Sequence, residues 1–322
     1  MPRYRNQLPQ LSDKIFLTDG GLETTLVFHD KIDLPLFAAF DLLRSKEGRG
    51  RIERYYELYA GIARARGLGF VLESPTWRAN PAWAARLGYG RGALAEINRE
   101  AIGMMVRVRD RFETESSPMV VSGCLGPRGD GYEPGRLMSA REAQAYHSEQ
   151  IEAFRDSEAD MISAMTLNYV EEAVGIAQAA RSAGMPVAIS FTVETDGRLP
   201  TGMTLEDAIL SVDRETARAP AYYMVNCAHP THFEALLDGS EWTARVRGLR
   251  ANASKRSHAE LDAALDLDDG DPVDLGRSYR ALRTRLPRLT VLGGCCGTDH
   301  RHVEQIALSC DPVSAEGNLV FV

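Results

Sequence analysis

The chain has 322 residues, of which 44% are hydrophobic and 25% are charged, as in an ordinary soluble globular protein. Its formal net charge of −8 argues against nucleic-acid binding, which requires clustered Lys and Arg side chains. Because no apolar run approaches the roughly 20 residues that span a bilayer, and the N-terminus lacks a signal peptide's apolar stretch, we expect a cytoplasmic protein without membrane contact.

Short β-rich segments alternate with longer helical patterns along the chain, which is typical of βα units around a parallel sheet. The predicted strands are Lys14–Thr18, Gly69–Glu73, Met119–Ser122, Asp160–Ala164, Pro186–Phe191, Tyr222–Asn226, Arg247–Ala251 and Leu289–Gly293. Helices with apolar residues at i, i+3 and i+4 spacing are predicted at Gly50–Arg66, Ala93–Glu113, Ala140–Glu158, Val170–Ala183 and Thr204–Ala217.

These units predict an α/β protein with a (β/α)8 TIM barrel, formed as a single domain over residues 1–322. The alternative is an open doubly wound sheet, but no G-x-G-x-x-G fingerprint follows the first strand. The acidic segment Asp262–Asp274 is interpreted as a solvated surface loop. Since the sequence ends at Val322, soon after the last predicted helix, we expect a monomer or a homodimer.

Three of the five cysteines follow predicted strands at one end of the barrel. Cys295 and Cys296 come after the eighth strand between glycines, which let the backbone turn both sulfurs toward one point. Cys227 follows the sixth strand, so its thiol faces the same axial cavity. Three soft ligands suit Zn²⁺, which needs an open fourth position to do chemistry. The sequence therefore predicts a catalytic zinc site.

Other interpretations of the cysteines remain open. The alternative for the adjacent Cys295 and Cys296 is that they are two small side chains buried in the core, since unpaired cysteine is often buried. Cys124 is predicted in a loop after the third strand, and Cys310 in the core face of the last helix. An odd number of cysteines without a signal peptide does not indicate a disulfide framework.

A zinc ion with three thiolate ligands points to chemistry on a thiol. It binds a substrate thiol as fourth ligand and favours the thiolate near neutral pH. A thiolate is the nucleophile for an in-line alkyl transfer, for which the protein must align a donor. We therefore predict methyl transfer to a thiol.

Several strand-end motifs resemble the homocysteine S-methyltransferase family over nearly the whole chain. They are Asp19-Gly20-Gly21, Ser122-Gly123, Gly126-Pro127, Asn226-Cys227, Asn252 and Gly293-Gly294-Cys295-Cys296-Gly297-Thr298. The resemblance implies a (β/α)8 barrel with zinc on the three cysteines named above. It also implies that Asp19 lies near the acceptor's amino group, although an ordinary Asp-Gly turn is the alternative. Asn226 is expected to fix the ligand loop or to line the site.

The fourth strand departs from the family's pattern. The family ends this strand in a Glu-Thr pair that helps to hold the acceptor's ammonium group, whereas this chain has Met165 before Thr166. Losing a charge-assisted contact weakens binding by about 1.5–3 kcal/mol. Glu73, at the end of the second strand, is expected either to replace that contact or to pair with Arg78 or another nearby base.

The site prediction has three parts. The metal ligands are Cys227, Cys295 and Cys296, and the catalytic candidates are Asp19, Glu73 and Asn226. The substrate-binding candidates are Asp19, Gly20, Gly21, Glu73, Thr76, Trp77, Met165 and Thr166. Trp77 is expected to form an aromatic wall for a cationic methyl donor, with core packing as the alternative.

The predicted function is a zinc-dependent S-methyltransferase whose partners are small molecules. A sulfonium or quaternary ammonium compound donates the methyl group, and a thiol such as homocysteine accepts it and becomes methionine. Two alternatives remain. The acceptor is a different thiol, because Met165 replaces the expected Glu, or the barrel binds zinc or thiols without catalysis.

Overall fold

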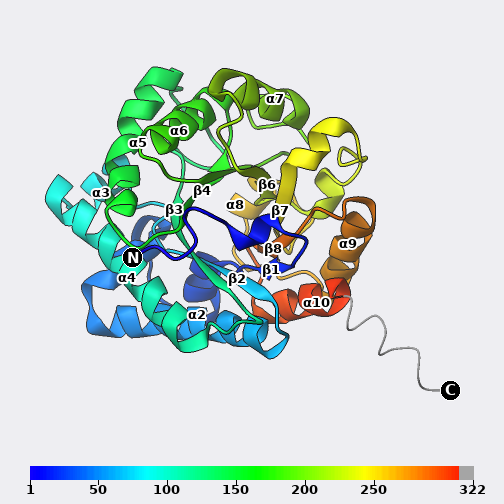
Figure 1. Cartoon of the computed structure of the whole chain (residues 1–322), viewed down its shortest axis with the longest axis horizontal. Helices are drawn as coiled ribbons and strands as arrows, with labels where there is room; N and C mark the ends of the chain where they lie inside the picture. The colour runs from blue at the N-terminus through cyan, green and yellow to red at the C-terminus, as the bar shows by residue number, and fades with distance from the viewer. Residues whose placement is uncertain (312–322) are drawn as a thin grey trace.

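The computed structural model describes residues 1–311, and residues 312–322 of the predicted single domain lie outside the described residues. Eight parallel strands pair in sequence order and close into a barrel through β1 and β8, with helices around the outside (Figure 1). The strands are β1 Phe16–Leu17, β2 Gly69–Glu73, β3 Met119–Leu125, β4 Met161–Leu167, β5 Val187–Phe191, β6 Tyr222–Asn226, β7 Val246–Ala251 and β8 Val291–Gly294. The predicted (β/α)8 barrel is confirmed, and the open doubly wound alternative is wrong.

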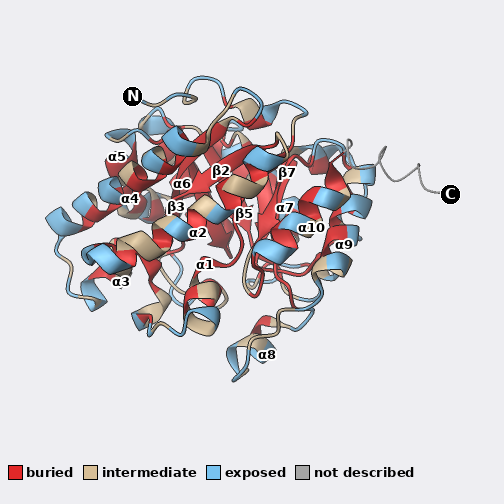
Figure 2. Ribbon diagram, turned by 90° about the horizontal axis from the view of Figure 1, so that it is seen from below, coloured by how far each residue is buried: buried red, intermediate tan, exposed pale blue. Residues whose placement is uncertain are grey.

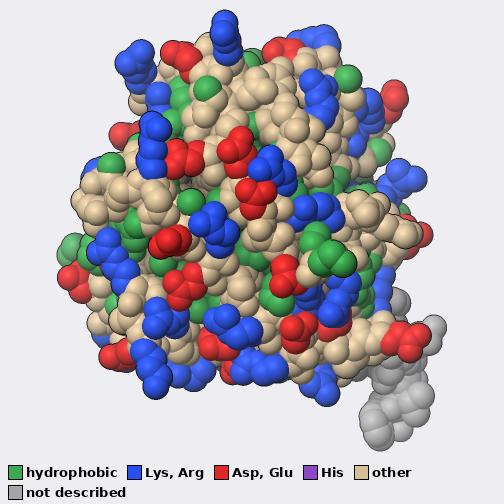
Figure 3. All heavy atoms as spheres, turned by 60° about the vertical axis from the view of Figure 1, so that its left-hand side comes forward, with side chains coloured by type: hydrophobic (Ala, Val, Ile, Leu, Met, Phe, Trp, Pro, Cys, Tyr) green, Lys and Arg blue, Asp and Glu red, His purple; other side chains and the backbone are tan. Residues whose placement is uncertain are grey.

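Short helical turns and longer helices connect the strands. The α-helices are α1 Leu22–Thr24, α2 Lys46–Ala65, α3 Pro81–Arg86, α4 Arg91–Phe112, α5 Ala140–Arg155, α6 Val170–Ser182, α7 Leu205–Thr216, α8 His258–Asp262, α9 Pro272–Arg285 and α10 His300–Cys310. Among residues 1–311, no helix is both long and apolar enough to cross a membrane. On the face shown in Figure 3, Lys and Arg side chains are interspersed with Asp and Glu.

The longer helices around the barrel each bury one apolar face, and Figure 2 shows this buried layer in red between the barrel and the exposed outer faces, whereas the short helix α8 projects from the molecule. Helix α5 illustrates the local causes. Ser139 caps its first turn and Glu142 completes a capping box, while Ile151 and Phe154 on its inner face are fully buried. Cys310 ends α10 in the same layer, so its predicted core position is confirmed.

A second, smaller core fills the inside of the barrel near the beginnings of the strands. Phe16, Met161, Tyr222 and Val291 belong to it, and Leu8 from the N-terminal segment packs against them. That end is therefore closed by side chains. The opposite end, where the strands finish, is left for the functional site, as in other barrels of this class.

Two sequence predictions at this functional end need correction. Strand β3 continues through Leu125 because residues from Ser122 to Leu125 pair with β4, so Cys124 lies in a strand and not in a loop. The segment Asp262–Asp274 is not simply a solvated loop. It begins at the last residue of α8, and α9 begins within it at Pro272. The residues of the segment that line the main cavity are Asp262, Ala264, Asp266, Leu267 and Asp268.

Candidate metal centre and active site

The thiol sulfurs of Cys227, Cys295 and Cys296 lie within 4.8 Å of one another at the ends of β6 and β8. Within residues 1–311, these three side chains form the one group of His, Cys, Asp and Glu with metal-ligand spacing. Cys227 and Cys295 are joined as a disulfide, with their Cα atoms 5.4 Å apart. Binding a metal through all three sulfurs requires the reduced thiols.

Cys227 is held in a conformation that non-glycine residues seldom adopt. Its φ is 54°, in the left-handed region, where strain persists only if the surroundings enforce it. Its amide donates to the Arg250 carbonyl at 3.1 Å. Its own carbonyl accepts from Asn252 Nδ2 at 3.0 Å and interacts with His258 Nε2 at 2.7 Å. These bonds fix the direction of the first thiol.

A tight turn after β8 presents the other two thiols. The Thr298 amide donates to the Cys295 carbonyl at 3.1 Å, and Gly297 at the third position has φ of 78°, which favours glycine. The glycine before the turn is needed for a different reason: a Cβ on Gly294 would collide with the Thr298 side chain. The turn therefore brings neighbouring cysteines, which a strand would send to opposite faces, to one point.

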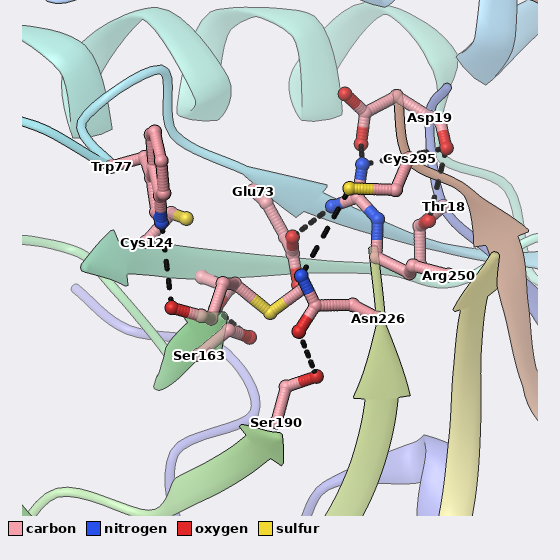
Figure 4. A network of polar contacts seen from close by, with 12 residues as sticks. Thr18, Asp19, Glu73, Trp77, Cys124, Ser163, Ser190, Asn226, Arg250 and Cys295 are labelled. Carbon is pink, nitrogen blue, oxygen red and sulfur yellow. Dashed lines mark hydrogen bonds and ion pairs between the residues drawn. The ribbon is translucent and has the colours of Figure 1, made fainter. Parts of the chain in front are cut away.

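Asn226 connects this cluster to strands β4 and β5. Its Oδ1 accepts from the Thr166 amide at 2.9 Å and the Ser190 hydroxyl at 2.6 Å. Its Nδ2 donates to Thr166 Oγ1 at 2.8 Å and faces the Cys295 sulfur at 3.9 Å (Figure 4). The amide thus holds the cluster in place and also lies at the cavity.

The three cysteines open into a cavity of about 440 Å³. Of the predicted site residues, those that line it are Asp19, Gly20, Gly21, Glu73, Trp77, Met165, Thr166, Asn226 and the three cysteines. Thr76 does not line the cavity. Its buried hydroxyl donates to the Cys124 carbonyl at 2.6 Å and bonds with Ser74, so it supports the loop after β2 instead.

Arg250, at the end of β7, is a central residue that the sequence analysis missed. Its guanidinium pairs with Asp19 Oδ1 at 2.8 Å and with the Glu73 carboxylate, and it donates to the carbonyls of Gly20 and Gly294 at 3.0 and 2.9 Å (Figure 4). The side chain is buried. Glu73 therefore pairs with a base, although the base is Arg250 and not Arg78. The sequence feature that could have identified it is an arginine near the end of a predicted strand, next to apolar residues.

Burial shifts the acid–base behaviour of this site. It raises the pKa of Asp19 to about 6, although Arg250 opposes the shift. Burial also raises the pKa of the Cys296 thiol to about 11. The Tyr132 hydroxyl lies 3.8 Å from that sulfur and its ring stacks on His258, with centroids 3.9 Å apart. Tyr132 and α8 therefore cover the sulfur cluster from the outer side.

Glu23 is a second cavity residue that the sequence analysis missed. It lies in α1, directly after the Asp19-Gly20-Gly21 turn, and its side chain is half-buried. Burial raises the pKa of its carboxyl to about 7. Its position four residues after Asp19, in the loop at the catalytic end, was the signal that could have identified it.

The cysteine cluster fits zinc. Three thiolates are a soft donor set of the kind zinc prefers, and a tetrahedral ion on them keeps one position free. All three cysteines line the cavity, so that position is accessible to a small molecule. Fold and site together define a (β/α)8 barrel enzyme with a three-cysteine cluster that can hold a metal at its strand ends.

The sequence places the chain within one family of such enzymes. Residues 16–310 match the homocysteine S-methyltransferase family, and the chain belongs to that family, whose members are thiol methyltransferases. The resemblance found in the strand-end motifs is thereby confirmed.

The fold also matches solved structures of MmuM, a homocysteine methyltransferase from Escherichia coli. Its oxidised form has a TM-score of 0.70 at 18% identity, covering 94% of this chain and 99% of that one. Its metallated form has a TM-score of 0.69 at 19% identity, covering 91% and 95%. At this identity the match supports the shared barrel fold.

Proposed function

We propose that the chain is a zinc-dependent S-methyltransferase that moves a methyl group from a sulfonium or quaternary ammonium donor to a thiol. The observation that carries the proposal is the convergence of Cys227, Cys295 and Cys296 on a cavity large enough for small-molecule substrates. Zinc held by these sulfurs would bind the acceptor thiol as a fourth ligand and keep it as thiolate near neutral pH.

The surrounding residues would orient the substrates and limit water around them. Asn226, Asn252 and His258 hold the cysteine loops, as outer groups do around metal ligands. Trp77 and Tyr132 line the cavity and offer aromatic faces to a cationic donor. Alignment of donor and acceptor is the main contribution required of the protein in an in-line transfer.

Homocysteine is our first choice of acceptor, because the chain belongs to the family named for it. Met165 favours a second candidate, a different thiol. Its thioether lines the cavity and cannot pair with an ammonium group. Asp19 and Glu73 are also both paired with Arg250, which competes with an ammonium group for their oxygens.

The test combines metal content with product analysis. Reduced protein, loaded with zinc, is incubated with a panel of thiols and with S-methylmethionine, S-adenosylmethionine or betaine, and products are identified by mass spectrometry. We expect one zinc per chain and methylation of at least one thiol. Cys296→Ser should abolish both, whereas Cys310→Ser, which changes a buried thiol outside the cluster, should preserve both. Protein that binds no zinc, or a Cys296→Ser variant that still methylates thiols, would contradict the proposal.

A further inference from the structure

The carboxylates that line the cavity differ in whether they already have a partner. Asp19 and Glu73 pair with Arg250, and Asp130 pairs with Arg78 at 3.0 Å. Glu23 has no ion pair or hydrogen bond to another side chain in the part of the chain that the structure describes. Asp262 and Asp266 also line the cavity, but both are exposed to solvent, so Glu23 is the half-buried carboxylate of the described cavity wall that has no cationic partner.

Arg250 already engages both Asp19 and Glu73. Its Nε donates to the Gly294 carbonyl, one terminal nitrogen pairs with Glu73, and the other contacts Asp19. A substrate cation that approaches these carboxylates has to compete with Arg250 for their oxygens, and separating the buried ion pair would cost several kcal/mol per ion left without a partner. The prediction that Glu73 replaces the missing contact at strand four therefore loses its support.

Glu23 lies where a substrate in the cavity would meet it. Asp19, Arg78 and Arg250 are close enough for their charges to influence the Glu23 pKa, and Glu23 in turn raises the pKa of Cys296. The carboxylate thus shares the cavity wall with the sulfur cluster, Arg250 and Arg78. A half-buried carboxylate without a partner is unfavourable, so a ligand that supplies a cation there gains binding energy.

The chemistry of the transfer decides which cation suits this position. The sulfonium or quaternary ammonium centre of the donor loses its positive charge as the methyl group moves. A carboxylate fixed beside it would stabilise the ground state more than the transition state and would slow the reaction. A primary ammonium group keeps its charge throughout. Aromatic faces such as Trp77 suit the reacting cation better, because their attraction is weaker.

We propose that Glu23 is a specificity residue that binds the primary ammonium group of an amino-acid substrate in this cavity. The inference rests on the proposed function, because that function supplies the reason for a substrate at the sulfur cluster. An ammonium group occurs both in an aminothiol acceptor and in an amino-acid sulfonium donor. The binding chemistry is the same for either substrate, and the experiment separates them.

The experiment uses calorimetry on reduced, zinc-loaded protein with two matched pairs of ligands. One pair is homocysteine and its desamino analogue, and the other is S-methylmethionine and its desamino analogue. We expect the native protein to prefer the ammonium-bearing member of at least one pair by about tenfold to a hundredfold. Glu23→Gln should abolish that preference, and Glu23→Asp should retain part of it.

Asp266→Asn is the matched control, because it removes an exposed carboxylate at the rim of the same cavity. It should leave the preference unchanged. Loss of preference in the acceptor pair assigns Glu23 to the acceptor, and loss in the donor pair assigns it to the donor. A folded Glu23→Gln protein that keeps the full preference in both pairs would overturn the inference, as would a native protein with no preference in either pair.

The two proposals fail in different ways. If no thiol is methylated with any donor but the ammonium preference exists and depends on Glu23, the proposed function is wrong and the ammonium site stands. If thiols are methylated and Glu23→Gln changes neither preference, the function stands and the ammonium site is wrong.

Discussion

The two walls of the cavity are built on different principles. The sulfur wall, formed by Asn226, Cys227, Cys295 and Cys296, brings three sulfurs that could bind a metal in the reduced state to one point. The charged wall is formed by Asp19, Glu23, Glu73 and Arg250, in which Arg250 pairs with Asp19 and with Glu73 and leaves Glu23 without an ion pair. Under the two proposals above, reactivity and substrate choice are separable in this molecule, because the sulfur wall would determine the reaction and the charged wall would select the substrate.

The largest expected effect comes from breaking the sulfur wall. Cys296→Ser replaces a soft thiolate ligand by a hydroxyl. Losing a residue that only supports a metal ligand typically lowers metal affinity by about 10- to 100-fold, so losing a ligand itself should lower the zinc affinity by more than that. Thiol methylation should be lost with the metal. Zinc content after dialysis against a chelator and product formation by mass spectrometry measure both effects. Zinc retention equal to that of the native protein would show that the sulfur wall is not the metal site.

The next effect comes from breaking the charged wall. Arg250→Met leaves Asp19 and Glu73 buried without a counterion, so the free energy of unfolding should fall by about 3–5 kcal/mol. Urea denaturation measures this loss, and Arg155→Met on the exposed surface serves as the control, with a change below about 1 kcal/mol. A loss of similar size in both variants would show that the ion pairs around Arg250 contribute little.

Asn226→Ala tests how the sulfur wall is supported. The variant leaves the buried Thr166 amide without its acceptor, so we expect a loss of about 1–3 kcal/mol in unfolding free energy. Zinc affinity should also fall by about 10- to 100-fold, because the support of the Cys295 sulfur is removed. Competition with a metal chelator measures the affinity. A destabilised variant with native zinc affinity would assign Asn226 to folding alone.

The smallest effect concerns the pH dependence of stability at Glu23. Its pKa is raised from 4.5 to about 7, so the folded state prefers the protonated carboxyl. The stability from this group is present below about pH 4.5 and is lost as the pH rises through about 7. Glu23→Gln lacks this titration. The native protein should therefore lose roughly 1–2 kcal/mol relative to the variant across this interval, after allowing for water in the cavity.

Urea denaturation at several pH values, without substrates, measures the difference between the two proteins. Parallel pH profiles for the native protein and Glu23→Gln would show that the carboxyl is not desolvated in the folded state.

The fold and the sulfur wall could be predicted from sequence because both depend on local patterns. Strand β6 was predicted with the bounds that the structure shows, and the glycines around Cys295 and Cys296 indicated the turn that brings two thiols together. The ends of β3 and β4 were placed too early, because glycine in one strand and a bulge in the other disguised the continued pairing.

The charged wall could not be predicted, because its contacts join distant strands. Arg250 meets Asp19 and Glu73 only once β1, β2 and β7 close into the barrel. Thr76 seemed a substrate contact from its place after β2, but its hydroxyl direction depends on the neighbouring Cys124 carbonyl. The role proposed for Glu23 could be inferred only once the partners of the other cavity carboxylates were known.

The most direct test of the account is X-ray absorption spectroscopy at the zinc edge on reduced protein, with and without an acceptor thiol. We predict three protein sulfurs at about 2.3 Å from the metal in the absence of thiol, together with one lighter ligand. Adding the acceptor should raise the sulfur count to four. A site with a fourth protein ligand that the thiol cannot displace would contradict the account and would favour a barrel that binds metal without catalysing methyl transfer.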